Sequence, residues 1–475
     1  MAPIMFGGLI VFLLIGYPAA FSLGAVGLFF SFIGIEMGMF QPTFLQALPD
    51  RVFGILSNDL LLSIPFFTFM GAILEKCGLA EDMLEGLGQL FGPIRGGLAY
   101  AVIIVGAILG AITGTVAASV IAMGLISLPI MLRYGYNPRV ATGVIAASGT
   151  ITQLIPPSLV LIVLADQLGK SVGDMYAGAI GPSIIQIILF CLFIFFLSIF
   201  RPQDVPALPP EARPKIDWKL FKKILWGIVP SIALIFLVLG TILMGLATPT
   251  EGGAMGSVGA LVLAAMNKRL QKTLVWDAMT STMRINAMVI FILIGSTVFG
   301  LAFRGVDGDL WIEHLLSGLP GGQVGFLIVV NLFVFFLAFF LDYFEIAFII
   351  IPLLAPVAQK LGIDLIWFGV LLGANMQTSF MHPPFGFALF YLRGVAPKSV
   401  KSSDIYYGAL PWVGLQLILV AIIIFVPETV TYFIDKPAIA VDANAISVDP
   451  LAGVEQNEIT VDSSSEIERQ LRENK

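Results

Sequence analysis

Long uninterrupted apolar stretches dominate the hydrophobic pattern of this chain. Stretches of about 20 residues recur, and each is long enough to cross a hydrocarbon core of roughly 30 Å as an α-helix. We predict membrane spans at 18–35, 59–75, 140–165, 178–200, 224–244, 285–303 and 407–426. The pattern therefore predicts an all-α, polytopic membrane protein.

Two further apolar segments, 97–132 and 324–358, are too long for one span and too short for two. Each has a glycine-rich or polar middle, at 110–115 in the first and at 341–345 in the second. A re-entrant hairpin, in which two half-helices meet at mid-depth, fits this pattern. A single long tilted helix is the alternative interpretation.

Each of these segments precedes an apolar helix that is interrupted in its centre, at 140–165 and at 366–393. The interruptions carry the proline pairs Pro156-Pro157 and Pro383-Pro384. Proline lacks a backbone N–H donor and keeps the preceding residue out of helical geometry. A broken backbone inside a bilayer is tolerated only where it is buried in protein or lines a wet cavity. We therefore expect function at the two breaks.

The two breaks belong to an internal repeat. Residues 148–158 read SGTITQLIPPS and residues 375–385 read NMQTSFMHPPF, with the proline pairs 227 positions apart. The same offset aligns Pro129 with Pro356, Gly135 with Gly362, and Asn137 with Asp364, the last two being predicted helix N-caps. An odd number of predicted crossings separates the starts of the two halves, so the second is inverted. Inverted repeats with a site at their interface are typical of secondary transporters.

Composition and charge agree with a membrane protein. The chain has 475 residues, of which 58% are hydrophobic and 12% charged, and its mean hydropathy is +0.97. The net charge of −6 comes mostly from the C-terminal tail and does not indicate nucleic-acid binding. Lysine and arginine favour cytoplasmic loops. With the basic loop 201–223 placed inside, only Arg51, Lys170, Arg304 and Lys360 fall outside, apart from the tail.

Polar side chains gather at the two predicted breaks. Hydroxyl and amide oxygens, with carbonyls freed by unwinding, suit a hard cation such as Na⁺, and half-helix N-termini favour an anionic substrate. The alternative is that these groups join helices or satisfy kinks. The candidate residues are Ser148, Gly149, Thr150, Thr152 and Gln153 at the first break, and Asn375, Gln377, Thr378 and Ser379 at the second.

The predicted hairpin middles add four candidates. Thr113 and Thr115 align with Asp342 and Glu345, and an ionisable side chain at mid-membrane is a functional hypothesis. Asp342 could bind a cation, cap a half-helix or form a salt bridge. Arg304 fits a snorkelling surface residue better than a substrate ligand. No phosphate loop, zinc motif or nucleophile–histidine motif is present, so we expect no enzyme.

Four segments together resemble the large membrane subunit (the DctM-like, or M, subunit) of tripartite ATP-independent periplasmic (TRAP) transporters. They are ATPTEGGA at 247–254, SGTITQLIPPS at 148–158, the stretch from FLDYFE at 340–345 through Pro352, and NMQTSFMHPPFG at 375–386. The resemblance covers about 1–430. The tail beyond about 436 is acidic, polar and longer than is usual in that family, and its composition is typical of a flexible segment.

The resemblance implies an elevator-type secondary transporter in the bacterial inner membrane. It implies Na⁺ symport, a small membrane subunit (Q type), and a periplasmic substrate-binding protein (P type) that delivers an organic acid. The segments IPFFTFMGA at 64–72 and DYFE at 342–345 look more like the branch for 2-oxo acids and other monocarboxylates than the C4-dicarboxylate branch.

On this resemblance the chain divides into six parts. Residues 1–96 are the scaffold and arm helices of repeat 1, and 97–166 are its transport-domain hairpin and broken helix. Residues 167–304 are scaffold helices that connect to repeat 2, and 305–394 are its arm, hairpin and broken helix. Residues 395–435 form a last membrane helix, and 436–475 form the tail. The alternatives are a stand-alone divalent-anion/Na⁺ symporter of similar architecture and a non-transporting assembly subunit.

Overall fold

The computed structural model describes residues 1–213 and 218–434, and every regular element in that part of the chain is helical. The elements before residue 213 are α1 (Ala2–Ile15), α2 (Ala19–Glu36), η1 (Pro42–Ala47), α3 (Leu48–Leu56), α4 (Asp59–Lys76), α5 (Leu79–Phe91), α6 (Gly97–Thr113), α7 (Val116–Arg133), α8 (Pro138–Thr150), η2 (Ile151–Gln153), α9 (Leu159–Leu168), α10 (Val172–Phe200) and η3 (Pro210–Ala212).

The elements after residue 217 are also joined by short connections. They are α11 (Trp218–Leu243), α12 (Pro249–Met266), α13 (Lys272–Gly305), α14 (Gly308–Ser317), α15 (Gly322–Leu337), α16 (Tyr343–Glu345), η4 (Ile346–Ile350), α17 (Ile351–Lys360), α18 (Leu365–Ser379), α19 (Phe387–Val395), α20 (Ser402–Phe425) and α21 (Glu428–Thr431). The tail predicted from 436 onward and the side chain of Thr113 lie outside the described residues.

Seven helices of the described part are long and apolar enough to cross a membrane, or up to nine if each of two bent helix pairs counts as one span. The all-α polytopic prediction is therefore confirmed. One predicted span is shorter than the helix that contains it. The span at 285–303 is only the apolar part of α13, which has 34 residues and is about 51 Å long at 1.5 Å per residue. The first half of α13 was not predicted, because it contains charged residues such as Asp277 and Arg284. The length of an apolar stretch predicts only the part of a helix that is suited to lipid.

The repeat predicted from the sequence is present in the order of elements. A membrane helix, a short helix, a hairpin and a broken helix follow one another as α4–α9 and again as α13–α19. Asn137 Oδ1 accepts a hydrogen bond from the Arg139 N–H at 3.0 Å, and Asp364 Oδ1 accepts one from the Trp367 N–H at 2.8 Å. Gly135 and Gly362, at the same offset, both have left-handed φ angles, 84° and 71°. The two N-cap predictions are therefore confirmed.

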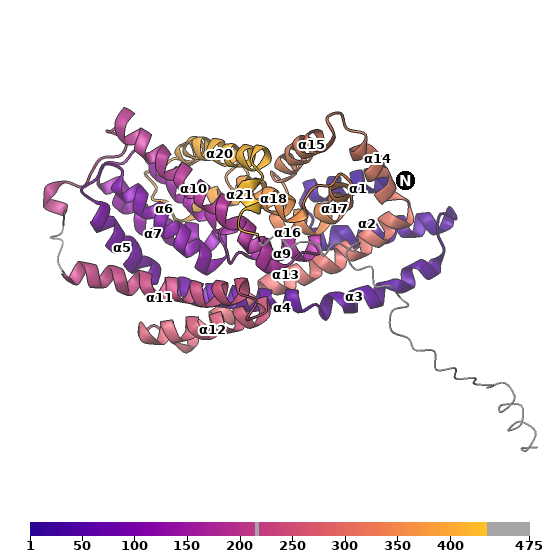
Figure 1. Cartoon of the computed structure of the whole chain (residues 1–475), viewed down its shortest axis with the longest axis horizontal. Coiled ribbons are helices and arrows are strands. Elements are labelled where there is room, and N and C mark those ends of the chain that lie inside the picture. The colour runs from indigo at the N-terminus through magenta and orange to yellow at the C-terminus, as the bar shows by residue number, and fades with distance from the viewer. Residues whose placement is uncertain (214–217, 435–475) are drawn as a thin grey trace, which may run out of the picture. The chain divides into compact units, whose positions relative to one another are not determined.

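Both long apolar segments break at their predicted middles. In the first, α6 ends at Thr113, Gly114 adopts a left-handed φ of 61°, and α7 starts at Val116 and packs against α6. In the second, α15 ends at Leu337 and helix resumes at Tyr343. Figure 1 shows α6 and α7 toward the left of the view and α15 and α17 toward the right. Neither segment is therefore a single long helix, and in the first segment the two arms pack against each other as a hairpin.

The helices of residues 1–434 pack in two layers. The first layer contains α1–α4 and α11–α13, in which α13 packs against α2, α3 and α4. The second layer contains α6–α10 and α15–α20, in which α20 packs against α8 and α18. Figure 1 shows α11, α12, α4 and α3 along the lower side, with α6, α10, α20 and α15 above them. The hairpins and broken helices thus share one layer.

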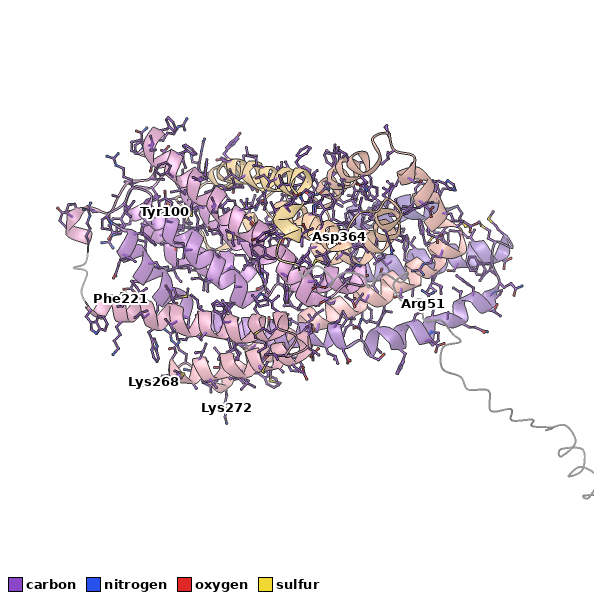
Figure 2. The ribbon with its side chains drawn as sticks, viewed as in Figure 1. Arg51, Tyr100, Phe221, Lys268, Lys272 and Asp364 are labelled. Atoms are coloured by element: carbon purple, nitrogen blue, oxygen red, sulfur yellow. The ribbon has the colours of Figure 1, made fainter. Side chains whose placement is uncertain are left out.

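Basic residues that the predicted topology assigns to opposite sides of the membrane lie in different regions of the fold. In Figure 2, Lys268 and Lys272, predicted cytoplasmic, lie toward the lower left, whereas Arg51, predicted to lie outside, lies toward the right. The helix α13 runs between these two regions, from Lys272 to Gly305. This separation agrees with the orientation inferred from lysine and arginine placement.

Candidate functional site

The first helix break lies between α8 and α9. After the single 3-10 turn η2, residues 154–158 leave helical geometry, and the Pro156-Pro157 bond is cis. Ser158 closes the break on both sides, because its hydroxyl donates to the Gln153 carbonyl at 2.6 Å and accepts from the Val160 N–H at 3.2 Å. The predicted interruption of 140–165 is confirmed.

The second break lies between α18 and α19, over residues 380–386. The Pro383-Pro384 bond is also cis. The Gly386 N–H donates to the His382 carbonyl at 2.6 Å. A Cβ on Gly386 would lie 2.5 Å from the Phe380 carbonyl oxygen, so only glycine fits where the loop returns to helix. The predicted interruption of 366–393 is confirmed as well.

The hydroxyl groups predicted at the breaks are buried and partly satisfied by their own helices. They donate to carbonyls three residues earlier: Thr150 to Ala147 at 2.8 Å, Thr152 to Gly149 at 2.8 Å, Thr378 to Asn375 at 2.7 Å, and Ser379 to Met376 at 2.5 Å. Each hydroxyl oxygen keeps a lone pair as an acceptor. The protons of these hydroxyl groups are therefore used in hydrogen bonds to their own helices, whereas their oxygens can still bind a cation.

Three of the other polar side chains predicted at the breaks have no partner among the described residues. The Ser148 hydroxyl and both side-chain amide atoms of Gln153 and Gln377 are buried and form no hydrogen bond with any described residue. A buried polar group without a partner costs about 1–3 kcal/mol, so such groups call for a ligand or water. Their oxygens are the donor type that hard cations prefer. The group fits a cation such as Na⁺.

Asp342 caps the second half of the second hairpin. Asp342 Oδ1 accepts from the Glu345 N–H at 2.8 Å, and Glu345 Oε2 accepts from the Asp342 N–H at 3.0 Å, which forms a capping box. Of the alternatives for Asp342, the helix cap is present, and Asp342 forms no ion pair with any described residue. Thr115 occupies the N-cap position of α7, although its side chain makes no capping bond.

A cavity of about 180 Å³ brings the tips of both hairpins and residues of both breaks together. Thr115 and Val116 come from the first hairpin, Asp342 and Phe344 from the second. Gln153, Phe380 and Tyr391 come from the broken helices, and Ile285 and Met288 of α13 close it from the first layer. Ser148, Asn375 and Gln377 do not line the cavity but are buried in the helices behind it.

The first hairpin packs directly against the first break through glycines. A Cβ on Gly106 would lie 2.7 Å from Ser148 Cβ, and one on Gly110 would lie 3.0 Å from Thr152 Cα. On the other arm, a Cβ on Gly149 would lie 2.2 Å from Val120 Cγ2. The spacing of Gly106 and Gly110 is the small-residue pattern that lets membrane helices approach closely. Gly149, predicted as a site residue, has this packing role.

Two site residues escaped the sequence analysis. Gln416 of α20 is fully buried and donates from Nε2 to the Thr150 hydroxyl at 2.9 Å. The carbonyl of Asn331 in α15 accepts from Asn375 Nδ2 at 2.8 Å. Both are polar residues inside apolar segments, which is the signal that marks intramembrane function. The elements that they contact could not be known from the sequence.

Comparisons with known proteins agree with the resemblance inferred from the motifs. A family model described as "Tripartite ATP-independent periplasmic transporter, DctM component" matches residues 6–429. A C4-dicarboxylate TRAP transporter large permease of Rhodobacter capsulatus is 29% identical over 445 residues, which cover 90% of this chain and 97% of that protein. Its counterpart in Vibrio cholerae is 28% identical over 448 residues, covering 88% and 94%.

Two further similarities add information on architecture. An isethionate TRAP transporter permease, named DctMQ, of Oleidesulfovibrio alaskensis is 26% identical over 432 residues, which cover 91% of this chain and 66% of that protein. The solved structure of the YdaH transporter of Alcanivorax borkumensis matches with a TM-score of 0.56 at 15% identity, covering 80% of this chain and 86% of that one. The YdaH match shows the fold alone.

Proposed function

Because the chain belongs to the DctM component family of tripartite ATP-independent periplasmic transporters, we propose that it carries an organic acid across the bacterial inner membrane by Na⁺-coupled symport. A periplasmic binding protein delivers the acid, and a small membrane subunit completes the complex. The hairpins and broken helices move as an elevator against the remaining helices. The parts 97–166 and 305–394 form the moving domain.

One observation carries this proposal: the tips of both hairpins and residues of both breaks meet at one cavity. At that cavity the first N–H groups of α7 receive no side-chain cap, and such a helix end attracts a carboxylate. The equivalent end in the second hairpin is occupied by Asp342. The substrate carboxylate therefore binds at the first hairpin rather than the second.

The coupling ion is assigned to oxygens of the two breaks, at the cavity and in the helices next to it. Ser148 Oγ, Gln153 Oε1 and Gln377 Oε1 are buried without partners among the described residues. Thr150 and Thr152 offer further oxygens on the same turns. Bound Na⁺ supplies positive charge that offsets the substrate anion. Since the ion and the acid share the hairpins and breaks, binding of each favours the other.

Uptake in proteoliposomes tests the proposal. The chain is reconstituted with its small subunit, and uptake of labelled succinate and pyruvate is measured with and without the periplasmic binding protein, under a Na⁺ or a K⁺ gradient. We expect uptake of one acid only with Na⁺ and with the binding protein present. Uptake without the binding protein would identify a stand-alone symporter, and equal uptake in K⁺ would refute Na⁺ coupling.

The choice of acids separates two substrate classes. Relatives in Rhodobacter capsulatus and Vibrio cholerae are named for C4-dicarboxylates, whereas the motifs at 64–72 and 342–345 favour monocarboxylates. We propose the monocarboxylate class. Succinate uptake that exceeds pyruvate uptake at equal concentration would refute this assignment without affecting the transport mechanism. No uptake of any acid by the full complex would favour a non-transporting assembly subunit.

A further inference from the structure

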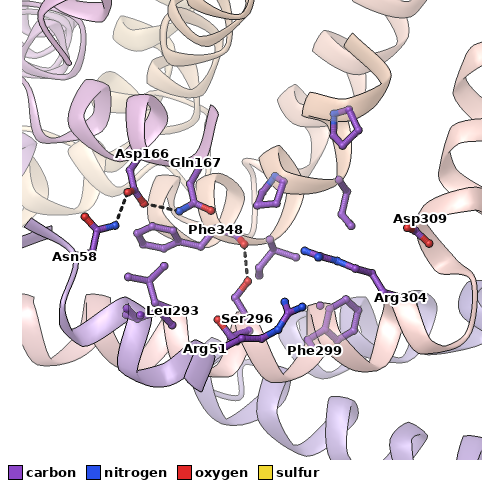
Figure 3. A pocket seen from close by; sticks show the side chains of 18 of the residues that line it. Arg51, Asn58, Asp166, Gln167, Leu293, Ser296, Phe299, Arg304, Asp309 and Phe348 are labelled. Atoms are coloured by element: carbon purple, nitrogen blue, oxygen red, sulfur yellow. Dashed lines mark hydrogen bonds between the residues drawn. The ribbon is translucent and has the colours of Figure 1, made fainter. Parts of the chain in front are cut away.

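A second, larger cavity of about 630 Å³ lies between the two layers (Figure 3). Its walls from the first layer are α3, α4 and α13, and its walls from the second layer are α9, η4 and α17, while Asp309 and Glu313 of α14 also line it. Its volume is in the range of small-molecule sites, about 300–1,000 Å³. It shares no lining residue with the cavity at the hairpin tips.

The two cavities follow one another along the same helices. On α13 the hairpin-tip cavity touches Ile285 and Met288, whereas the large cavity begins at Leu293 and extends to Arg304. The five residues from Met288 to Leu293 correspond to about 7.5 Å at 1.5 Å per residue. On α9 the order is the same, from Leu159 to Asp166. The large cavity therefore lies on the side of the hairpin-tip cavity where the topology predicts the periplasm.

Two arginines from the first layer project into the large cavity. Figure 3 shows Arg51, from α3, and Arg304, from α13, with their guanidinium groups directed into the same space. Neither guanidinium group forms a hydrogen bond or ion pair with a described residue. Arg304 is thus a cavity residue as well as an exposed one, which the snorkelling interpretation did not anticipate. These are two of the four basic residues predicted outside.

The acidic groups at the cavity are mostly occupied. Asp166 accepts from Asn58 Nδ2 at 2.7 Å and from Gln167 Nε2 at 2.8 Å. Glu313 forms an ion pair with Lys360. Asp309, the remaining carboxylate, is exposed on α14, and Figure 3 shows it beyond Arg304. Hydrogen bonds from neutral amides leave the charge of Asp166 in place, and Lys360 balances Glu313, so two arginines face two aspartates and the positive charge is local to Arg51 and Arg304.

The other walls of the cavity around the two arginines are apolar. Leu293, Phe299 and Phe348 are apolar, and a cleft with apolar walls focuses the field of its charged groups. The guanidinium group presents paired N–H donors that match a carboxylate. Ser296 holds the second layer at this point by donating to the Phe348 carbonyl at 2.5 Å.

We propose that this cavity is a second, outer binding site for the carboxylate of the organic acid, held by Arg51 and Arg304. The ligand identity rests on the proposed function, whereas the site itself does not. The acid occupies the outer site first and then passes along α9 and α13 to the hairpin tips. The affinity is modest because both arginines are exposed to water.

Protection from arginine modification tests the site without transport. The purified chain in detergent is treated with phenylglyoxal, which modifies free guanidinium groups, and adducts are quantified by mass spectrometry. Pyruvate or succinate, against chloride at constant ionic strength, should slow modification of Arg51 and Arg304 and leave Arg201 unchanged. Arg201 is a matched control because it is exposed and its guanidinium group has no partner among the described residues. Equal modification with and without the acids overturns the proposal.

Substituted chains give the second readout. In the reconstituted complex, Arg51→Gln and Arg304→Gln should each raise KM for uptake by up to about fivefold, as expected for the loss of a solvent-exposed ion pair. They should leave kcat unchanged, and Arg201→Gln should change neither. Unchanged KM in both variants overturns the outer site even if wild-type uptake is normal. Protection of both arginines in a complex without uptake supports the outer site and refutes the proposed transport function instead.

Discussion

The close packing of the first hairpin on the first break makes a sharp prediction for Gly106. In Gly106→Ala the new Cβ would lie 2.7 Å from Ser148 Cβ and 2.9 Å from the Ser148 carbonyl oxygen. Carbon atoms pack best at about 3.5 Å, so α6 must retreat by about 0.8 Å. Overpacking of this kind costs about 1–3 kcal/mol. The displacement also moves the hairpin away from the residues that we assign to the ion.

Gly240→Ala is the matched control, because a Cβ at Gly240 of α11 would meet nothing within 4 Å. Both variants gain the same helix propensity, up to about 1 kcal/mol, so their difference isolates the overpacking. Thermal unfolding of the purified chains at one scan rate, together with Na⁺-driven uptake, measures the effect. We expect Gly106→Ala to melt below Gly240→Ala and to lose uptake. Identical melting and uptake would show that α6 does not contact the break as described.

The remaining predictions concern the cap, the ion and a supporting amide. Asp342→Ala should destabilise the chain by about 1 kcal/mol, whereas Asp342→Asn keeps a good N-cap and should keep both stability and uptake; a stable Asp342→Asn chain without uptake would show that the charge itself is needed. Thr150→Ala and Gln377→Ala should impair Na⁺-dependent uptake more than the yield of folded protein; parallel loss of yield and uptake in both would make these residues structural. Gln416→Leu removes the donor to Thr150 and also an unpaired amide oxygen, so stability should change by less than about 1 kcal/mol while the Na⁺ concentration for half-maximal uptake rises. An unchanged Na⁺ dependence would place Thr150 outside the ion site.

Local chemistry explains which parts of the site were predictable. The breaks follow from Pro156-Pro157 and Pro383-Pro384, because proline interrupts a helix wherever it stands in the middle of a span. The hairpin tips follow from Gly114 and Asp342, a residue that permits a left-handed φ and a residue that caps a helix. These signals act within a few residues of the chain, so no tertiary information was needed to find them.

Contacts between distant segments explain what was not predictable. Gln416 reaches Thr150 across 266 positions of the chain, and Asn375 reaches Asn331 across 44. Neither partner follows from a local pattern. The full length of α13 also escaped detection, because its first half continues as helix beyond the apolar part of the sequence. The role of Arg304 depends on α17 and α9, which complete the cavity around it.

The sequence by itself determined the class of protein, the inverted repeat, the hairpins, the breaks and the family. Those features depend on apolar length, proline and glycine positions and motif order, all of which are local or strictly periodic. Only the tertiary structure decided which polar groups meet. It brought Gln153, Thr115 and Asp342 to one cavity, left Gln377 behind it, and placed Arg51 opposite Arg304 in another. The physical reason is that a site between repeats is formed by packing of two layers, and packing depends on the shapes of all the helices at once.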